Sequence, residues 1–304
     1  MKLRVVGNSI KEMMRWLSML LCMGLAMPAL ATQHIKTIFE LKDSPHRELV
    51  EYALTITEPE YGPAALIFAE QMTQGRVEQL MKGGQALELA VFAPDIEREQ
   101  ALLPVYFPLS RGLLGYRVCL IKQGQQPKFD TVTSLDSWRE AGLLIGQGAN
   151  WPDVQILRAN NILVTTNPMP PLLFNMLRQQ RFDCFARGVN EVEYELRQSY
   201  TSGLALEAKL LFYYPQPALL FVSPNRPELA KRLQLGLDRA WHDGYMQQHF
   251  SQRYGKLVNQ LRCEKRRLLV LNNPFLSQQT ESAMLQYALS PEQLLAVAGE
   301  NCPF

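Results

Sequence analysis

Residues 87–122 constrain the fold of this 304-residue chain more than any other stretch. An apolar run over residues 87–93 predicts a buried strand, and a charged loop carrying Arg98 follows it. The chain then passes through two prolines into a second apolar run over residues 116–121. A strand that ends in a charged loop and then leaves for another sheet is typical of a chain that builds a cleft between two lobes.

The first 31 residues have the pattern of an export signal. A basic start precedes an apolar run over residues 16–25, and Ala29-Leu30-Ala31 forms a small-x-small cleavage site. The alternative is an N-terminal membrane anchor, but the apolar run is well short of the roughly 20 residues that span a bilayer. We therefore expect cleavage after Ala31 and a periplasmic location.

Composition excludes several classes of function. The whole sequence has 31 Lys and Arg against 29 Asp and Glu, so it lacks the basic field that nucleic-acid binding needs. The sequence has no second long apolar segment, so it predicts no membrane span after the export signal. The 4 histidines are scattered and the cysteines show no CxxC or Cys/His spacing, so we expect neither a metal site nor a cofactor.

Four cysteines lie after the export signal. Cys263 and Cys302 lie outside the predicted core strands, so in an oxidising compartment they can form a disulfide that ties the C-terminal tail to the body. Cys119 and Cys184 lie inside apolar runs, and we expect them to be buried free thiols.

Strand-like and helix-like segments alternate in both halves of the chain. The predicted strands of the two halves cover residues 34–41, 64–69, 87–93, 143–145, 162–165 and 182–186. Amphipathic stretches between them predict crossover helices. The fold class is therefore α/β with two lobes, each a mostly parallel sheet flanked by helices, joined by two crossover strands.

The division of the chain follows from a predicted return crossing. The apolar run over residues 218–222 follows two prolines and leads back to the first lobe, which is then discontinuous. The expected parts are a signal peptide (1–31), the first part of lobe 1 (32–116), lobe 2 (117–217), the return part of lobe 1 (218–262) and a C-terminal tail packing on the body (263–304).

Three segments carry a similarity to a known family. They are FAPDIEREQALLPVYFPL, TSLDSWREAGLLIGQGANWPD and PELAKRLQLGLDRAWHDGYMQQHFSQRYG. Together they resemble the amino-acid-binding branch of the type 2 periplasmic solute-binding proteins, the extracellular solute-binding family 3, over residues 35–256. The resemblance implies the two-lobed type 2 fold and non-catalytic binding of a small molecule in the cleft. The implied partner is an inner-membrane ABC permease for uptake, or a membrane receptor for signalling.

Arg98 is the first candidate ligand contact. In the family the matching arginine grips the α-carboxylate of the ligand, and a guanidinium can do this with two parallel hydrogen bonds. The alternative is a surface arginine paired with Glu97 or Glu99. The acidic residue that the family places after a lobe 2 strand is replaced here by Arg187. Two arginines favour a carboxylate-bearing ligand, with Asn190 as a neutral hydrogen-bonding group.

The turn over residues 147–151 is the second candidate region. It precedes a predicted helix, whose unpaired backbone N–H groups attract an anion or a carbonyl oxygen. Gln147 and Asn150 are the candidate contacts in this turn, and Trp151 can stack on a flat or aliphatic ligand. The alternatives are an ordinary strand-to-helix connection and a tryptophan of the core.

Two other functions stay open on the same fold. An exported enzyme of the dehydratase type needs a general acid, and Glu191 and Glu97 are the candidates near the cleft. A partner-binding protein with a vestigial cleft is the other alternative, with residues 264–304 available to dock the partner.

Overall fold

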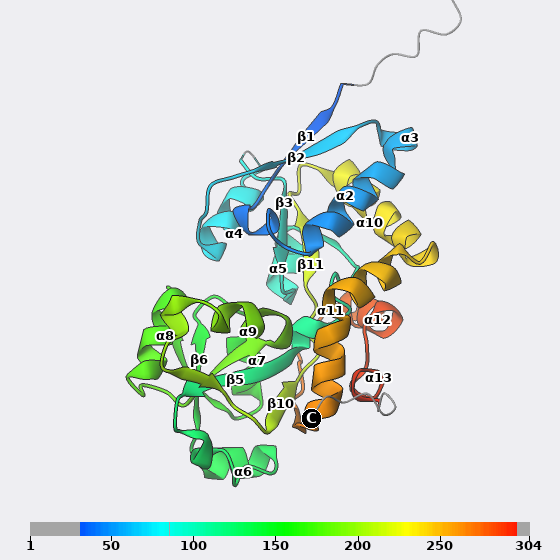
Figure 1. Ribbon diagram of the computed structural model, residues 1–304. Helices are drawn as coiled ribbons and strands as arrows, with labels where there is room; N and C mark the ends of the chain where they lie inside the picture. The colour runs from blue at the N-terminus through cyan, green and yellow to red at the C-terminus, as the bar shows by residue number, and fades with distance from the viewer. Residues whose placement is uncertain (1–30, 85, 297–304) are drawn as a thin grey trace, which may run out of the picture. The chain divides into compact units, whose positions relative to one another are not determined.

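The computed structural model describes residues 31–84 and 86–296 (Figure 1). The expected export signal lies outside the described residues apart from Ala31, and so does Cys302. No helix among the described residues is long and apolar enough to cross a membrane.

The first lobe is built on a five-stranded sheet with the order β2-β1-β3-β11-β4. Its strands are β1 (Gln33–Thr37), β2 (Ala64–Phe68), β3 (Leu89–Phe92), β4 (Leu103–Val105) and β11 (Leu219–Val222). Strand β1 pairs in parallel with β2 and β3, as the alternation of strands and helices predicts. The returning strand β11 runs antiparallel to both β3 and β4, so the sheet is mixed.

Helices cover both faces of the first sheet. They are η1 (Phe39–Leu41), α2 (His46–Ile56), α3 (Glu58–Tyr61), α4 (Gln74–Lys82), α5 (Ile96–Ala101) and α10 (Pro227–His242). The apolar faces of α2 and α10 pack into one core with the strands. Helix α10 crosses α2 closely at Gly236, where a Cβ atom would lie 2.4 Å from the carbonyl oxygen of Ala53.

The second lobe is built on a seven-stranded sheet with the order β12-β10-β5-β8-β6-β7, and β9 pairs with β5. The strands are β5 (Tyr116–Lys122), β6 (Leu144–Gly148), β7 (Leu163–Asn167), β8 (Cys184–Gly188), β9 (Leu204–Leu206), β10 (Leu210–Tyr213) and β12 (Arg267–Val270). The helical segments before β9 are η2 (Leu113–Gly115), η3 (Gln126–Lys128), α6 (Leu135–Glu140), α7 (Asp153–Ala159), α8 (Pro171–Arg178), α9 (Val189–Leu196) and η4 (Ser199–Thr201).

A disulfide joins Cys119 of β5 to Cys184 of β8, with 5.1 Å between the Cα atoms. The expectation that these cysteines are free thiols was wrong. Strands β5 and β8 are antiparallel neighbours in the sheet, and this pairing brings the two cysteines within the Cα distance that a disulfide needs. The expected pairing of Cys263 with Cys302 involves a residue outside the described ranges.

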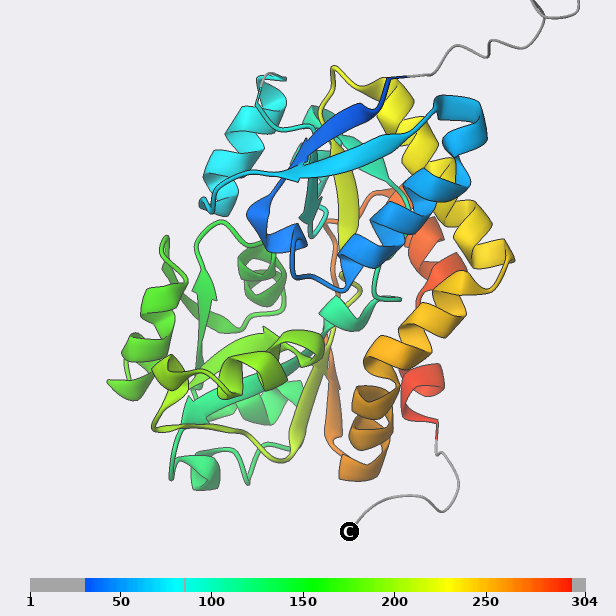
Figure 2. The ribbon, with the colours of Figure 1, turned by 45° about the horizontal axis from the view of Figure 1, so that its top comes forward.

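The segment after residue 264 contacts both lobes (Figure 2). Helix α11 (Tyr245–Glu264) leads to β12, which pairs in parallel with β10 and so extends the second sheet. Helix α12 (Gln278–Tyr287) then packs on the first lobe, where Tyr287 donates a hydrogen bond of 3.0 Å to Asp238 of α10. Helix α13 (Pro291–Leu295) returns to α11 and buries Leu294. The tail therefore belongs to the packed body of the protein.

Candidate functional site

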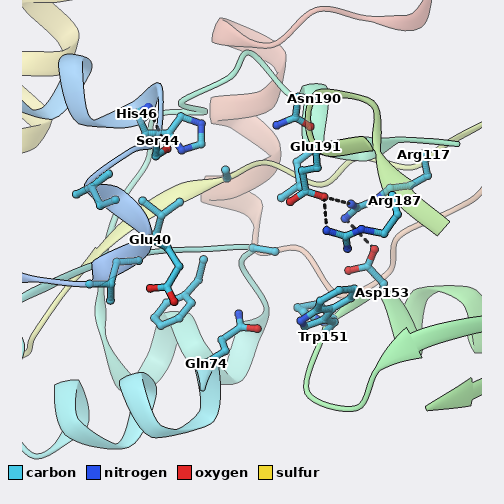
Figure 3. Close-up of a pocket in the computed structure, with 18 residues that line it drawn as sticks. Glu40, Ser44, His46, Gln74, Arg117, Trp151, Asp153, Arg187, Asn190 and Glu191 are labelled. Atoms are coloured by element: carbon cyan, nitrogen blue, oxygen red, sulfur yellow. Dashed lines mark hydrogen bonds and ion pairs between the residues drawn. The ribbon is translucent and has the colours of Figure 1, made fainter. Parts of the chain in front are cut away.

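A cavity of about 300 Å³ lies between residues of the first and second lobes (Figure 3). Its polar and aromatic lining comes from η1, α2, α4 and the loops beside them, and from β5, β8, α7 and α9. The first lobe contributes Glu40, Ser44, His46 and Gln74, and the second contributes Arg117, Trp151, Asp153, Arg187, Asn190 and Glu191. Both lobes thus present charged groups to one cavity.

A larger cavity of about 920 Å³ adjoins the first and shares part of its lining. Glu40, Trp151, Arg187 and Glu191 border both cavities. The larger cavity continues along a more apolar wall, to which Met72, Pro168, Pro170, Pro171 and Tyr200 contribute. The larger cavity therefore adds an apolar stretch of wall to a lining that is charged in both cavities.

Arg117 is a buried cation on strand β5, within the apolar run that forms the centre of the second sheet. Its Nη2 lies 2.8 Å from Oδ1 of Asp153, and its Nε donates to the hydroxyl oxygen of Tyr214 at 3.1 Å. The Tyr214 hydroxyl in turn donates to Asp153 at 2.5 Å. Burial lowers the pKa of Arg117, but the attraction of Asp153 and Tyr214 outweighs it, and the pKa lies above its ordinary value. The guanidinium stays charged because its counter-charges are buried with it.

Arg187 is the second buried cation and lies at the end of β8. Its Nε donates to both carboxylate oxygens of Glu195 at 2.9 Å, and its Nη2 donates to Oε1 of Glu195 at 2.6 Å. The guanidinium also lies 4.9 Å from the ring centroid of Trp151, in cation–π contact. Burial lowers the pKa of Arg187, but Glu191 and Glu195 raise it by more.

Glu191 lies between the two arginines. Its Oε2 is 3.2 Å from Nη2 of Arg187 and 3.6 Å from Nη1 of Arg117, as the dashed lines to it in Figure 3 indicate. The same oxygen accepts from the backbone N–H of Gly188, three residues earlier, at the first turn of α9. Burial raises the pKa of Glu191, but Arg187 and Arg117 outweigh burial and hold the pKa below its usual value. Glu191 is therefore ionised at neutral pH.

Gly188 makes room for this cluster of charges. A Cβ atom at this position would lie 2.9 Å from Oε2 of Glu191 and 2.8 Å from Oδ1 of Asn190. A larger residue would push the Glu191 carboxylate away from the arginines. The Glu191 carboxylate can therefore lie between the two arginines only because residue 188 is a glycine.

Two buried polar atoms at the cavity have no hydrogen-bond partner in the protein: Nε2 of His46 and Oδ1 of Asn190. Burial and the nearby His249 lower the pKa of His46 to about 4, against a smaller opposing effect of Glu191. The imidazole is therefore neutral at pH 7. Buried polar atoms without partners are uncommon in folded proteins, and a bound molecule is one way to satisfy them.

Arg98 lies outside both cavities. It is only 4 % exposed, and its Nη2 and Nη1 lie 3.0 Å from Glu78 and Asp95 respectively. Its Nη1 also donates to the carbonyl oxygen of Ala93, and the guanidinium stacks over Phe92. The partners are therefore not the Glu97 or Glu99 of the sequence alternative, and the structure does not place this arginine where it could grip a ligand in the cavity.

The other predicted contacts divide between the cavities. Trp151 borders both, and Arg187 and Asn190 line the smaller cavity. Asn150 lines the larger one. Gln147 is fully buried, and its side chain donates to the carbonyl oxygen of Ala186 in the neighbouring strand, so it holds the sheet and not the cavity lining.

Sequence reasoning missed four charged or titratable residues of the smaller cavity: Glu40, His46, Arg117 and Asp153. Arg117 gave a usable signal, because it is the one charged residue inside the apolar run over residues 116–121. Such a residue requires a buried counter-charge. Glu40 and His46 showed no such signal in the sequence, because their position at the cavity depends on how the first lobe packs.

The comparisons with known proteins support the fold. No protein-family model and no curated protein sequence matches this chain. Among solved structures, it is similar to an ancestral arginine-binding protein bound to arginine, at 14% identity and a TM-score of 0.53 over 75% of this chain and 100% of that chain. A histidine kinase sensor domain with similarity to periplasmic binding proteins matches at 13% identity and a TM-score of 0.54, over 74% and 96%.

A third similar structure is an ancestral amino acid-binding protein described as a precursor of cyclohexadienyl dehydratase. It matches at 12% identity and a TM-score of 0.51, over 73% of this chain and 95% of that chain. The chain therefore has the α/β fold of the type 2 periplasmic binding proteins, as expected from the sequence. Identities of this size establish the fold and leave the ligand to be argued from the site.

Proposed function

We propose that this protein is a non-catalytic, exported binding protein that takes a small polar solute into the cavity between its lobes. The observation that carries the proposal is the cavity itself, where groups of η1 and α2 face groups of β5, β8 and α9. Concave sites with a few converging polar groups are the usual form of small-molecule sites. The similar structures are amino-acid-binding proteins and a sensor domain, which supports the same role.

The proposed mechanism is closure of the lobes about the two connections near residues 114–118 and 218–222. Backbones come close at the first of them, since a Cβ atom at Gly115 would lie 2.2 Å from the carbonyl oxygen of Tyr214. A solute that contacts both lobes favours the closed arrangement by its differential affinity for it. The closed form would then engage an inner-membrane ABC permease or a membrane receptor in the periplasm.

The sequence favours a carboxylate-bearing solute, and the site geometry weakens that view. The sequence predicts Arg98 and Arg187 as the groups that hold this carboxylate. Arg98 lies outside the cavities, and Arg187 already makes a two-pronged contact with Glu195. A ligand carboxylate at Arg187 would have to displace a protein carboxylate, which disfavours a solute that binds through its carboxylate.

An enzyme on this fold is a weaker candidate. A dehydratase needs a general acid that is protonated near neutral pH. The pKa of Glu191 lies below its usual value because two arginines face it. Glu97, the other candidate, is exposed on α5 and lines neither cavity. Steady turnover of prephenate or arogenate by the purified protein would favour the enzyme over the binding protein.

The experiment that tests the proposal is a thermal-shift screen of the purified protein against amino acids, amines, dicarboxylates, aromatic acids and short peptides. A ligand at 100 times its dissociation constant adds about 2.7 kcal/mol of stability, which raises Tm measurably. We expect at least one hit whose shift is lost in Trp151→Ala, because Trp151 borders both cavities.

The matched control is Tyr194→Ala, which removes an aromatic ring that is 70% exposed on α9 and lines neither cavity. This variant should keep the shift. A screen with no hit, or a hit that survives Trp151→Ala, would favour the partner-binding alternative in which the cleft no longer takes a solute.

A further inference from the structure

The residues that line the two cavities carry more negative than positive charge. Among the described lining residues there are four carboxylates, those of Glu40, Asp153, Glu191 and Glu195, and two guanidiniums, those of Arg117 and Arg187. His46 adds no charge at neutral pH, because its pKa is about 4. The space therefore carries an excess of negative charge.

Both guanidiniums are already occupied by protein carboxylates. Arg117 has Asp153 at 2.8 Å, and Arg187 has Glu195 at 2.6 Å. Arg98 is likewise held by Glu78 and Asp95 away from the cavities. A ligand carboxylate would have to replace one of these buried contacts and leave the displaced carboxylate without a partner, which is costly.

Once these two pairs are formed, Glu191 and Glu40 remain. Glu191 is shared at longer distances, 3.2 Å and 3.6 Å, between arginines that each have a closer partner. Glu40 lies on η1 of the first lobe, and Figure 3 shows it across the cavity from Glu191. The excess negative charge is thus divided between the two lobes.

A second, independent observation concerns hydrogen bonding. Oδ1 of Asn190 is a buried acceptor without a donor, and Nε2 of His46 is a buried ring nitrogen without a partner. A neutral imidazole accepts a hydrogen bond at Nε2 when its proton is on Nδ1. Both residues line the smaller cavity, together with Glu40 and Glu191. Oδ1 of Asn190 therefore calls for a hydrogen-bond donor, and Nε2 of His46 accepts one in the tautomer with its proton on Nδ1.

We propose that the cavity binds a cationic solute that has no carboxylate, an amine or guanidinium compound whose charge lies between Glu40 of the first lobe and Glu191 of the second. This inference rests on the proposed binding function and names the chemical class of its ligand. The ammonium or guanidinium N–H groups donate to these carboxylates and to Oδ1 of Asn190. The apolar wall of the larger cavity takes the carbon skeleton of a longer solute.

The same geometry makes closure depend on the cation. Glu40 and Glu191 belong to different lobes, so bringing the lobes together without a solute brings two like charges closer to each other. A cation between them turns that repulsion into two attractions. Binding of the solute and closure of the lobes are then coupled through these two carboxylates.

The test compares three probes of similar size by isothermal titration calorimetry on the purified protein. Agmatine carries a guanidinium and an amine, arginine adds a carboxylate to the same skeleton, and glutarate carries carboxylates alone. We expect agmatine to bind at least 10-fold more tightly than arginine, and glutarate not to bind. Equal affinity for agmatine and arginine, or tighter binding of glutarate, would overturn the inference.

Two variants test the carboxylates. Glu40→Gln and Glu191→Gln should each weaken agmatine binding by about 10-fold or more, the usual effect of losing one charge-assisted contact. Glu58→Gln in the first lobe and Glu193→Gln on α9 remove the same charge from exposed positions outside both cavities and should bind agmatine like the wild type.

Gly188→Ala is a third variant that keeps every charge. Its methyl group displaces the Glu191 carboxylate, so agmatine binding should weaken, while glutarate should still not bind because Asp153 and Glu195 keep the two guanidiniums. Thermal melting of each variant without ligand shows whether it is folded. If Glu40→Gln and Glu191→Gln are folded and bind agmatine normally, the inference fails.

The two proposals fail in different ways. If no cation binds but another solute in the wider screen does, and Trp151→Ala abolishes that binding, the inference about charge is wrong and the binding function stands. If no solute binds at all, the binding function itself fails.

Discussion

At the scale of single residues, part of the site is a group of buried side chains that satisfy one another. Arg117, Asp153 and Tyr214 form a closed triangle of contacts no longer than 3.1 Å. Burial, and Asp153 beside it, raise the pKa of Tyr214 well above its ordinary value, so its hydroxyl stays a donor. Removing one member of such a group leaves the other members buried without partners. The resulting loss of stability is larger than the net stabilisation that the intact group provides.

His46 makes the stability of the first lobe depend on pH. Its pKa of about 4 in the folded protein lies below the ordinary histidine value of 6.5, because of burial first and His249 second, with Glu191 opposing. The unfolded chain therefore binds a proton at a higher pH than the folded chain. Stability is complete above about pH 6.5 and is lost as pH falls towards 4, by about 2–3 kcal/mol.

Urea unfolding at pH 7, 5.5 and 4.5 measures this effect. His46→Gln should flatten the loss between pH 6.5 and 4.5, while His242→Gln, which changes an exposed histidine of α10, should keep the wild-type dependence. The contribution of His46 is refuted if its variant loses as much stability on acidification as the wild type.

At the scale of secondary-structure elements, close backbone approaches decide how the lobes are packed. Helix α2 lies against α10 in the first lobe, and the side chains of both helices are buried in one core. In the second lobe, the antiparallel pairing of β5 with β8 places Cys119 and Cys184 together and holds Arg117 opposite Gly188. The disulfide thus lies in the same pair of strands that carries the two arginines.

Gly236→Ala should destabilise the protein by about 1–3 kcal/mol, because the new methyl group would overlap the backbone of Ala53 and force the helices apart. Gly255→Ala is the matched control in α11, where the nearest atom, Oγ of Ser251, lies at an ordinary 3.7 Å. Alanine is the better helix former, so this control should be neutral or stabilising. Urea unfolding of both variants is the measurement, and equal effects would contradict the packing argument.

At the scale of the whole described chain, the C-terminal segment connects the lobes a third time. Strand β12 completes the second sheet, and α12 is attached to the first lobe through Glu99 of α5. The Glu99 carboxylate accepts hydrogen bonds from Ser277 at 2.5 Å, Thr280 at 2.9 Å and Tyr106 at 3.2 Å. Any closure of the lobes must therefore carry or bend this segment.

Glu99→Ala should loosen α12, because three hydroxyl groups lose their common acceptor at a cost of about 1–3 kcal/mol. Amide hydrogen exchange should become faster in α12 and stay unchanged in β12, which is held by its own strand pairing. Glu97→Ala, an exposed substitution on the same helix, should leave both unchanged. Unaltered exchange in α12 of Glu99→Ala would show that the helix is held by other contacts.

The sequence by itself determined the order of strands and helices, and with it the fold. Alternating apolar runs and amphipathic stretches are local patterns, and burial of those runs against their neighbours is what selects the α/β arrangement. The sequence also predicted Trp151, Arg187 and Asn190 as site residues, and all three line the cavities. These residues follow directly from strand ends and helix starts, which a sequence reveals.

Only the tertiary structure decided which groups are partners. Arg98 is held by Glu78, 20 residues away, and Arg117 meets Asp153 and Tyr214 from separate elements of the second lobe. Charges and thiols act over a few ångströms, so their pairing depends on the packing of segments that are distant along the chain. The same packing sets Glu40 across the cavity from Glu191, which no local pattern of residues could have shown.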